Sequence, residues 1–189
     1  MTPLIYLHGF LSSPLSQKAQ ETAQWMAERG LSEYFLCPTI PMDPDIAERE
    51  LRALLTPFNG DFCLIGSSLG GFFASWAVEE LGGRAVLINP AVRPYALIQQ
   101  YVGEQENYQT GEIHYIDLSF SDKLRQLERK PSELHRYWLL SQTDDEVLNY
   151  QDAVEFYAGC KQTIIHGGDH GFVGYAQWLA EIWAFANTN

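Results

Sequence analysis

The feature that most constrains the fold is an alternation of short apolar runs with longer amphipathic segments along the chain. The apolar runs have the length and residue types of buried strands. They occupy residues 4–7, 34–37, 62–65, 85–88, 137–140 and 163–165. Strands that alternate with helices in this way predict an α/β protein, with a mostly parallel sheet of six strands and helices on both of its faces.

The amphipathic segments carry the start and stop signals of helices. Residues 16–29 place apolar side chains among charged ones and are followed by Gly30, a residue typical of helix C-termini. Asp43-Pro44 predicts an N-cap followed by proline in the first turn. Further helices are expected over residues 69–81 and 150–157 and at the C-terminal end. A chain of 189 residues with this pattern fits one domain, 1–189.

One stretch interrupts the alternation. Residues 91–134 contain no predicted parallel strand, only helix-like pieces at 95–102 and 117–128 and a turn at Thr110-Gly111. We expect this stretch to be a lid or cap insertion that passes over the sheet. Its apolar and aromatic side chains would then cover an apolar pocket; they include Tyr95, Tyr101, Tyr108, Tyr115 and Phe120.

Charge and composition exclude several classes of protein. Twelve Lys and Arg against 24 Asp and Glu give a net charge of −12, which repels phosphate backbones and anionic lipids. We therefore expect neither a nucleic-acid nor a membrane partner, and nothing indicates an oligomeric state. Residues 1–6 read as a strand rather than a secretory signal, so a cytoplasmic location is expected. The three cysteines, Cys37, Cys63 and Cys160, are too few for a disulfide framework and are expected to be buried thiols.

The segment Gly66-Ser67-Ser68-Leu69-Gly70 fits G-x-S-x-G between a predicted strand and a predicted helix. In this motif the central serine lies at a strained turn that exposes its hydroxyl, and glycines are needed two residues to either side because side chains there would collide. The pentapeptide is centred on Ser68, so Ser68 rather than Ser67 is the predicted nucleophile. The alternative is a glycine-rich turn without catalysis.

A serine nucleophile needs a histidine base and an acid that orients the base. His170 lies between the last predicted strand and the last helix, which is where this fold class carries its base. The acid is expected in the loop after residues 137–140, where Asp144, Asp145 and Glu146 compete. Asp145 precedes one residue and then Val147, as the acid of such loops commonly does, and is the preferred candidate.

The same chemistry needs two donors for an oxyanion. We expect the backbone N–H groups of Leu69 and Phe10 to supply them, and the side chains of Phe10 and Leu11 to form a wall of the acyl site. His8 is expected to be a structural residue. Arg93 is a candidate to offset the negative field near the site, although an exposed salt bridge is the plainer role.

Metal and nucleotide chemistry fit the sequence less well. Several potential ligands lie near one sheet edge, namely Asp144, Asp145, Glu146, His166, Asp169 and His170, but no His-x-His or His-Glu-x-x-His spacing occurs. The glycines at 66–71 lack the lysine and the spacing of nucleotide-binding loops. No metal is therefore expected.

Several motifs together resemble the small bacterial YqiA-type esterases of the α/β-hydrolase superfamily. They are Tyr6-Leu7-His8-Gly9-Phe10 with Ser12-Ser13-Pro14, the segment 66–72, Asn89-Pro90-Ala91-Val92-Arg93-Pro94, and Gly167-Gly168-Asp169-His170. The resemblance covers essentially the whole chain. It implies a compact α/β-hydrolase fold with strand order 2-1-3-4-5-6, and hydrolysis of carboxylic esters or thioesters without a cofactor. The Asp144 position, where such loops often carry Gly, departs from the pattern.

The sequence thus predicts a serine esterase that acts on a short to medium acyl ester or thioester through Ser68, His170 and Asp145. Acyl transfer and carbon–carbon bond hydrolysis use the same residues and stay open. A binding protein that has kept the fold without catalysis is the alternative of a different class.

Overall fold

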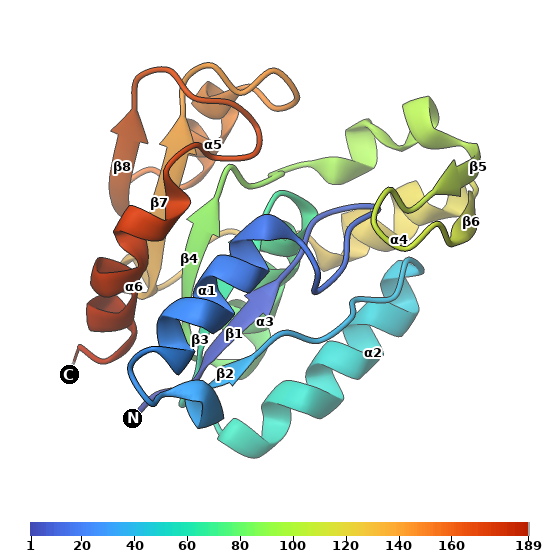
Figure 1. Ribbon diagram of the computed structural model, residues 1–189. Helices are drawn as coiled ribbons and strands as arrows, with labels where there is room; N and C mark the ends of the chain where they lie inside the picture. Colours follow the sequence, from blue (N-terminus) through green and yellow to red (C-terminus); the bar gives the residue numbers. More distant parts are fainter. Residues whose placement is uncertain (189) are drawn as a thin grey trace.

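The computed structural model describes residues 1–188 and is built around a six-stranded sheet (Figure 1). Its strands are β1 (Leu4–Leu7), β2 (Phe35–Leu36), β3 (Cys63–Ser67), β4 (Arg84–Ile88), β7 (Tyr137–Gln142) and β8 (Lys161–Ile165). Their order is β2-β1-β3-β4-β7-β8, and all five pairings are parallel. In chain order this is 2-1-3-4-5-6, so the predicted fold class and strand order are confirmed.

Helices cover both faces of the sheet. The helices are α1 (Gln17–Ala27), α2 (Pro44–Leu55), α3 (Leu69–Leu81), α4 (Ser119–Leu127), α5 (Tyr150–Phe156) and α6 (Leu179–Ala186). Alternate residues of each strand face opposite sides. In β1, Leu4 and Tyr6 pack with α1 and α6, whereas Ile5 and Leu7 pack with α2, α3 and α5. The sheet is therefore the shared centre of two apolar layers.

A local signal in the sequence accounts for the start of α2, whereas β2 departs from its predicted bounds. The Asp43 carboxylate accepts hydrogen bonds from the N–H groups of Asp45 and Ile46, so it caps α2 as predicted. The second strand is shorter than expected. Tyr34 ends a 3₁₀ helix (Ser32–Tyr34), and only Phe35 and Leu36 pair with β1. Cys37, just beyond this edge strand, is half-buried rather than buried, while Cys63 and Cys160 are buried.

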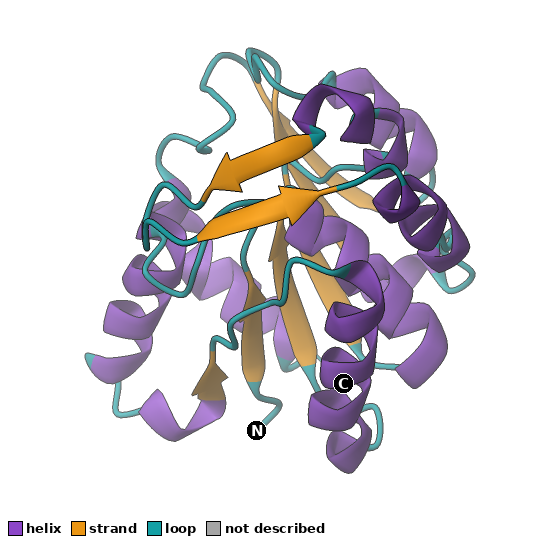
Figure 2. Cartoon of the chain, turned by 90° about the vertical axis from the view of Figure 1, so that its right-hand side faces the viewer, coloured by secondary structure: helices purple, strands orange, loops and turns teal. Residues whose placement is uncertain are grey.

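Residues 91–134 contain an element that the sequence analysis did not predict. Two short 3₁₀ helices (Pro94–Ala96 and Ile98–Tyr101) lead into an antiparallel hairpin of β5 (Gly103–Glu106) and β6 (Ile113–Ile116), and α4 follows. The 95–102 piece is thus 3₁₀ helix, and the predicted turn at Thr110-Gly111 lies between the two hairpin strands. Figure 2 shows the hairpin as a separate ribbon in front of the main sheet.

The loops that carry the polar candidate residues all begin at the carboxyl ends of the parallel strands. The chain turns from β3 into α3 at Ser68, from β7 into the loop 143–149, and from β8 into the loop 166–174. In a parallel sheet these ends lie along one edge, which is where α/β proteins place their ligands. Across residues 1–188, no helix has the length and apolar character needed to cross a membrane.

Candidate active site

Ser68 lies at a sharp turn between β3 and α3. Its backbone has φ 54° and ψ −119°, a conformation that non-glycine residues rarely adopt. The Ser68 N–H donates to the carbonyl of Ile88 (3.1 Å), and the Ser68 carbonyl accepts from the N–H groups of Gly71 (2.9 Å) and Ala91 (3.0 Å). The strain is therefore held by backbone bonds to the end of β4 as well as by the start of α3.

The glycines at 66 and 70 are required by close backbone contacts. A Cβ on Gly66 would lie 2.5 Å from the carbonyl oxygen of Gly70 and 2.6 Å from the Cα of Gly71. A Cβ on Gly70 would overlap the backbone of Leu7 and His8. Any side chain at either position would push the turn open, which is the steric reason predicted from the pentapeptide.

His170 brings the predicted serine and acid into one chain of contacts. Its Nε2 lies 3.1 Å from Ser68 Oγ, and its Nδ1 lies 2.8 Å and 3.0 Å from the two carboxylate oxygens of Asp145. A carboxylate at Nδ1 favours the tautomer with its proton on Nδ1, which leaves Nε2 free to accept from the serine hydroxyl. The side chain of Asp145 is 2% exposed and that of His170 is 23% exposed.

The environment of Asp145 keeps it ionised. Burial raises the pKa of this carboxyl, but the hydrogen bonds from His170 and from the N–H groups of Leu148 (2.8 Å) and Val147 (2.9 Å) outweigh burial and hold the pKa below its ordinary value. The adjacent Asp144 is exposed, and its carboxylate accepts from the hydroxyl of Thr143. The structure thus brings Asp145, and not Asp144, to His170.

The other histidine near the turn is occupied elsewhere. His8 is 4% exposed; its Nε2 accepts from the N–H of Ile40 (2.9 Å), so its Nδ1 carries the proton and donates to the carbonyl of Gly9 (3.0 Å). Burial lowers the pKa of His8. With both ring nitrogens engaged in the turn, His8 holds the loop after β1 beside Ser68, where a Cβ on Gly9 would lie 3.3 Å from the serine Cβ.

An apolar cavity of about 70 Å³ opens at Ser68. A single water molecule needs roughly 10–15 Å³ of such cavity volume, so the cavity has room for about five water-sized groups. Phe10 and Leu69 line it, whereas Leu11, expected beside Phe10, is not among the lining residues. The insertion supplies the largest share, with Ala91, Pro94, Leu97, Ile98, Tyr101, Phe120 and Leu124, and the remaining walls come from Met42, Pro44, Phe73, Val147 and Leu148.

Residues 3–187 match the model of a family described as uncharacterised protein family UPF0227. The chain belongs to this family. The match confirms the predicted resemblance to the YqiA-type proteins and extends over almost the whole chain.

Solved structures of low sequence identity share the fold of this UPF0227 member. Mouse alpha/beta hydrolase domain-containing protein 10 superposes with a TM-score of 0.70 at 18% identity, covering 96% of this chain and 88% of its own. Est1E from Butyrivibrio proteoclasticus has a TM-score of 0.69 at 16% identity, covering 97% and 85%. The esterase domain of a Rhodothermus marinus protein has a TM-score of 0.67 at 15% identity, covering 97% and 85%. These likenesses show the α/β-hydrolase fold.

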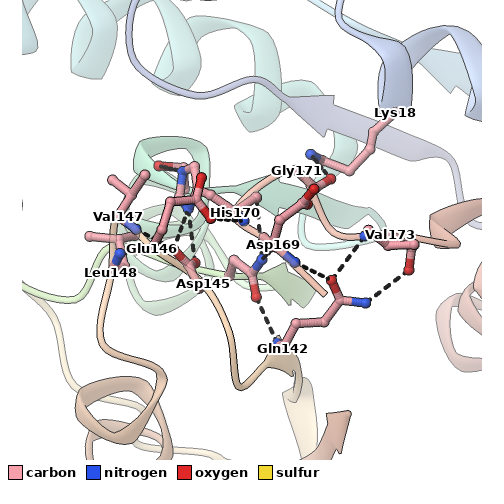
Figure 3. A network of polar contacts seen from close by, with 12 residues as sticks. Lys18, Gln142, Asp145, Glu146, Val147, Leu148, Asp169, His170, Gly171 and Val173 are labelled. Atoms are coloured by element: carbon pink, nitrogen blue, oxygen red, sulfur yellow. Dashed lines mark hydrogen bonds and ion pairs between the residues drawn. The ribbon is translucent and has the colours of Figure 1, made fainter. Parts of the chain in front are cut away.

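In this UPF0227 member, several polar residues make contacts around His170 that the sequence analysis did not predict (Figure 3). The Glu146 carboxylate accepts from the backbone N–H of His170 (3.0 Å), and the Lys18 ammonium donates to the carbonyl of Gly171 (2.8 Å). Burial lowers the pKa of Lys18. Gln142 contacts the same loop from below. No sequence signal marks these contacts, because Lys18 is in α1, Gln142 ends β7, Glu146 is in the following loop, and none belongs to a catalytic motif.

The remaining side chains that the sequence analysis named as metal-ligand or charge-offset candidates do not form a second site. His166 is exposed, Arg93 is exposed, and Glu146 is occupied by the backbone of His170. Within residues 1–188, no three His, Cys, Asp or Glu side chains are grouped so that they could hold a metal ion.

Proposed function

We propose that this protein is a serine hydrolase that cleaves short to medium acyl carboxylic esters or thioesters. The observation that carries the proposal is the continuous chain of contacts from Ser68 Oγ through His170 to Asp145, at 3.1 Å and 2.8 Å. A nucleophile, a base and an orienting acid in this arrangement, next to an apolar cavity, are the parts that acyl transfer to serine requires.

In the first step, His170 Nε2 takes the proton of Ser68 as Oγ bonds to the acyl carbonyl carbon. The negative charge moves to the carbonyl oxygen, and the ionised Asp145 stabilises the imidazolium. Collapse of this intermediate breaks the bond to the alcohol or thiol, which leaves with the proton from Nε2. A water molecule then gives a proton to Nε2 as its oxygen bonds to the acyl carbon; the bond to Oγ breaks, Oγ takes the proton back from Nε2, and the acid product and free Ser68 result.

Backbone groups near the turn are suited to hold the oxyanion. The N–H of Leu69 is in the first turn of α3, where N–H groups have no partner within the helix, and the helix dipole places positive charge there. Phe10 lies across the cavity in the loop after β1, and its N–H is the second proposed donor. Each such donor contributes about 3 kcal/mol to stabilising the transition state in comparable enzymes.

The walls of the cavity support an acyl-binding role. Its lining is apolar apart from Ser68, and its volume of about 70 Å³ suits a small acyl group. The insertion 91–134 acts in this proposal as a lid, because it supplies seven of the lining residues, five of them from its two 3₁₀ helices and α4.

The proposal is tested with p-nitrophenyl acetate, butyrate, hexanoate and dodecanoate, together with a thioester of butyrate. A feruloyl ester is added because Est1E has been solved with ferulic acid bound. Ser68→Ala is expected to lower kcat by about 10³-fold or more while the protein stays folded, and Ser67→Ala is expected to keep nearly all activity. Equal loss in both variants, or retained activity in Ser68→Ala, would contradict the assignment. Transfer of the acyl group to an added alcohol in preference to water would favour a transferase instead.

A further inference from the structure

Two buried amide side chains lie directly beneath the loop that carries His170. Asn89 follows β4 and is 3% exposed, and Gln142 ends β7 and is 2% exposed. They are joined to each other, because the backbone N–H of Gln142 donates to the side-chain Oδ1 of Asn89 (2.9 Å). We call this pair the amide clamp. Neither side chain lines the cavity or hydrogen-bonds to Ser68, so the proposed mechanism does not use them.

The amide clamp makes five hydrogen bonds to the backbone on either side of His170. Asn89 Nδ2 donates to the carbonyls of Asp169 (2.9 Å) and His170 (3.2 Å). Gln142 Oε1 accepts from the N–H groups of Asp169 (3.1 Å) and Val173 (2.9 Å), and Gln142 Nε2 donates to the Val173 carbonyl (2.8 Å). Donors and acceptors are thus matched without placing a charge beneath the imidazole.

The loop 166–174 needs this support because its glycine-rich backbone can adopt many conformations. Gly167, Gly168, Phe172 and Gly174 all have positive φ values, between 65° and 86°, and the loop is mostly exposed. Gly168 also leaves space for the clamp, since a Cβ there would lie 2.9 Å from the Cβ of Gln142. A glycine-rich surface loop samples many conformations unless neighbouring groups hold it.

Asn89 also connects the histidine loop to the serine turn. It directly follows Ile88, whose carbonyl accepts from the Ser68 N–H. Two residues after Asn89 comes Ala91, whose N–H donates to the Ser68 carbonyl. One short segment at the end of β4 therefore holds the backbone of Ser68 on one side and the backbone of His170 on the other. The segment thus links the backbones that carry Oγ and Nε2.

We propose that Asn89 and Gln142 are positioning residues that hold His170 in reach of both Ser68 and Asp145. The proposal rests on the function proposed above, in which His170 is the base. Small displacements of a base reduce the rate far more than they reduce binding. Loss of the clamp should therefore lower kcat and leave KM nearly unchanged.

The test compares Asn89→Gly, Gln142→Met and Tyr157→Phe. Asn89 has φ 41°, so glycine removes its side-chain hydrogen bonds without backbone strain, and methionine replaces Gln142 at similar volume. Tyr157→Phe is the matched control, because it removes a buried hydrogen bond, from Tyr157 to Ser75 (2.7 Å), without touching the histidine loop. Each variant is assayed for kcat and KM with p-nitrophenyl butyrate and for thermal stability.

A second measurement does not depend on activity. The proton between His170 Nδ1 and Asp145 gives a downfield proton NMR signal, which Asp145→Asn should abolish and thereby assign. We expect both clamp variants to lose or broaden this signal and to lower kcat by about 10- to 100-fold, with KM within about twofold of wild type. Tyr157→Phe should keep the signal and kcat even if it melts earlier.

The outcomes separate the two proposals. If the clamp variants are folded and keep both the signal and kcat, the amide clamp is structural only and the inference is wrong. If the wild-type protein hydrolyses no ester, the proposed function fails, and the NMR signal alone decides whether the clamp holds His170 against Asp145. Should Gln142→Met fail to fold, the same comparison of Asn89→Gly with wild type decides.

Discussion

The cavity at Ser68 has two sides that are built in opposite ways. On one side, the serine turn and the loops after β7 and β8 are fixed to the ends of the parallel strands, largely through backbone groups and buried amides. On the other side, the insertion 91–134 is an exposed hairpin and a short helix. It is attached by side chains such as Asn107, which donates to the carbonyl of Ser12 (2.9 Å).

In the function proposed above, this difference separates the groups that would react from the groups that would select the substrate. Backbone contacts at the serine turn tolerate no added atom, so this side is expected to be intolerant of substitution. The insertion contributes apolar side chains to the cavity, and except for Ala91, whose N–H is bonded to the Ser68 carbonyl, these are expected to change size without disturbing Ser68. The shape of the cavity can therefore vary while the proposed chemistry stays the same.

The largest expected effect falls on the strand side, at the two neighbouring aspartates. Asp145→Asn removes the carboxylate that orients His170 and should lower kcat by about 10³-fold or more. Asp144→Asn, one residue away and exposed, should stay within about twofold of wild type. Steady-state kinetics on the same ester decide this, and a reversed order would move the acid to Asp144.

Glycine substitutions on the two sides should differ in their effect on stability. Gly66→Ala forces a Cβ to 2.5 Å from a backbone oxygen and should lower the free energy of unfolding by about 3 kcal/mol. Gly111→Ala in the hairpin turn has open space and only a positive φ of 72°, so about 1 kcal/mol is expected. Urea denaturation measures both values. Equal losses would mean that the serine turn is no more tightly built than the hairpin.

A pH effect on stability should come from the loop after β1. Burial lowers the pKa of His8 in the folded protein, so below about pH 6.5 the unfolded chain takes up a proton that the folded chain does not. Stability is then full above this pH and falls as the pH is lowered, with a slope of at most about 1.4 kcal/mol per pH unit.

The control for this effect is a pair of histidine variants. His8→Gln, whose amide oxygen can still accept from Ile40, should flatten the slope measured by urea denaturation between about pH 5 and 6.5. His135→Gln changes an exposed histidine and should leave the slope as it is. An unchanged slope in His8→Gln would show that His8 does not titrate in this window.

The smallest effect is expected where the insertion is attached. Asn107→Ala removes the contact to Ser12 and the acceptor for the N–H groups of Gln109 and Thr110, and should destabilise the hairpin by about 1 kcal/mol. Hydrogen exchange should speed up in β5 and β6 and stay slow in β1 and β3. Tyr108→Ser, at an exposed position nearby, is the control. Faster exchange throughout the main sheet would show that the two sides are not independent.

The strand side of the cavity could be predicted from the sequence more fully than the insertion 91–134. The serine turn could be predicted because its glycines are required by local backbone contacts, and the sheet because its strands are continuous apolar runs. The spacing to Val147 favoured Asp145 over Asp144, but the coordinates were needed to place it, since a shift of one residue in a polar loop decides which carboxylate meets His170.

The hairpin could not be predicted for a physical reason. Its first strand reads Gly-Glu-Gln-Glu, which has no apolar alternation and low strand propensity, and it pairs only with β6. Tertiary contacts, such as that between Asn107 and Ser12, hold the hairpin in place. The amide clamp was not predicted for a related reason, because Asn89 and Gln142 bind backbone atoms of a loop that is distant in sequence.

The central claim is that Ser68 is an activated nucleophile, and reaction with a fluorophosphonate tests it most directly. The purified protein is treated with the reagent, and the adduct is located by peptide mass spectrometry, with Ser68→Ala and His170→Ala treated in parallel. The account predicts one adduct, on Ser68, that disappears in Ser68→Ala and forms far more slowly in His170→Ala. No adduct in a folded protein, or an adduct on Ser67, would contradict it.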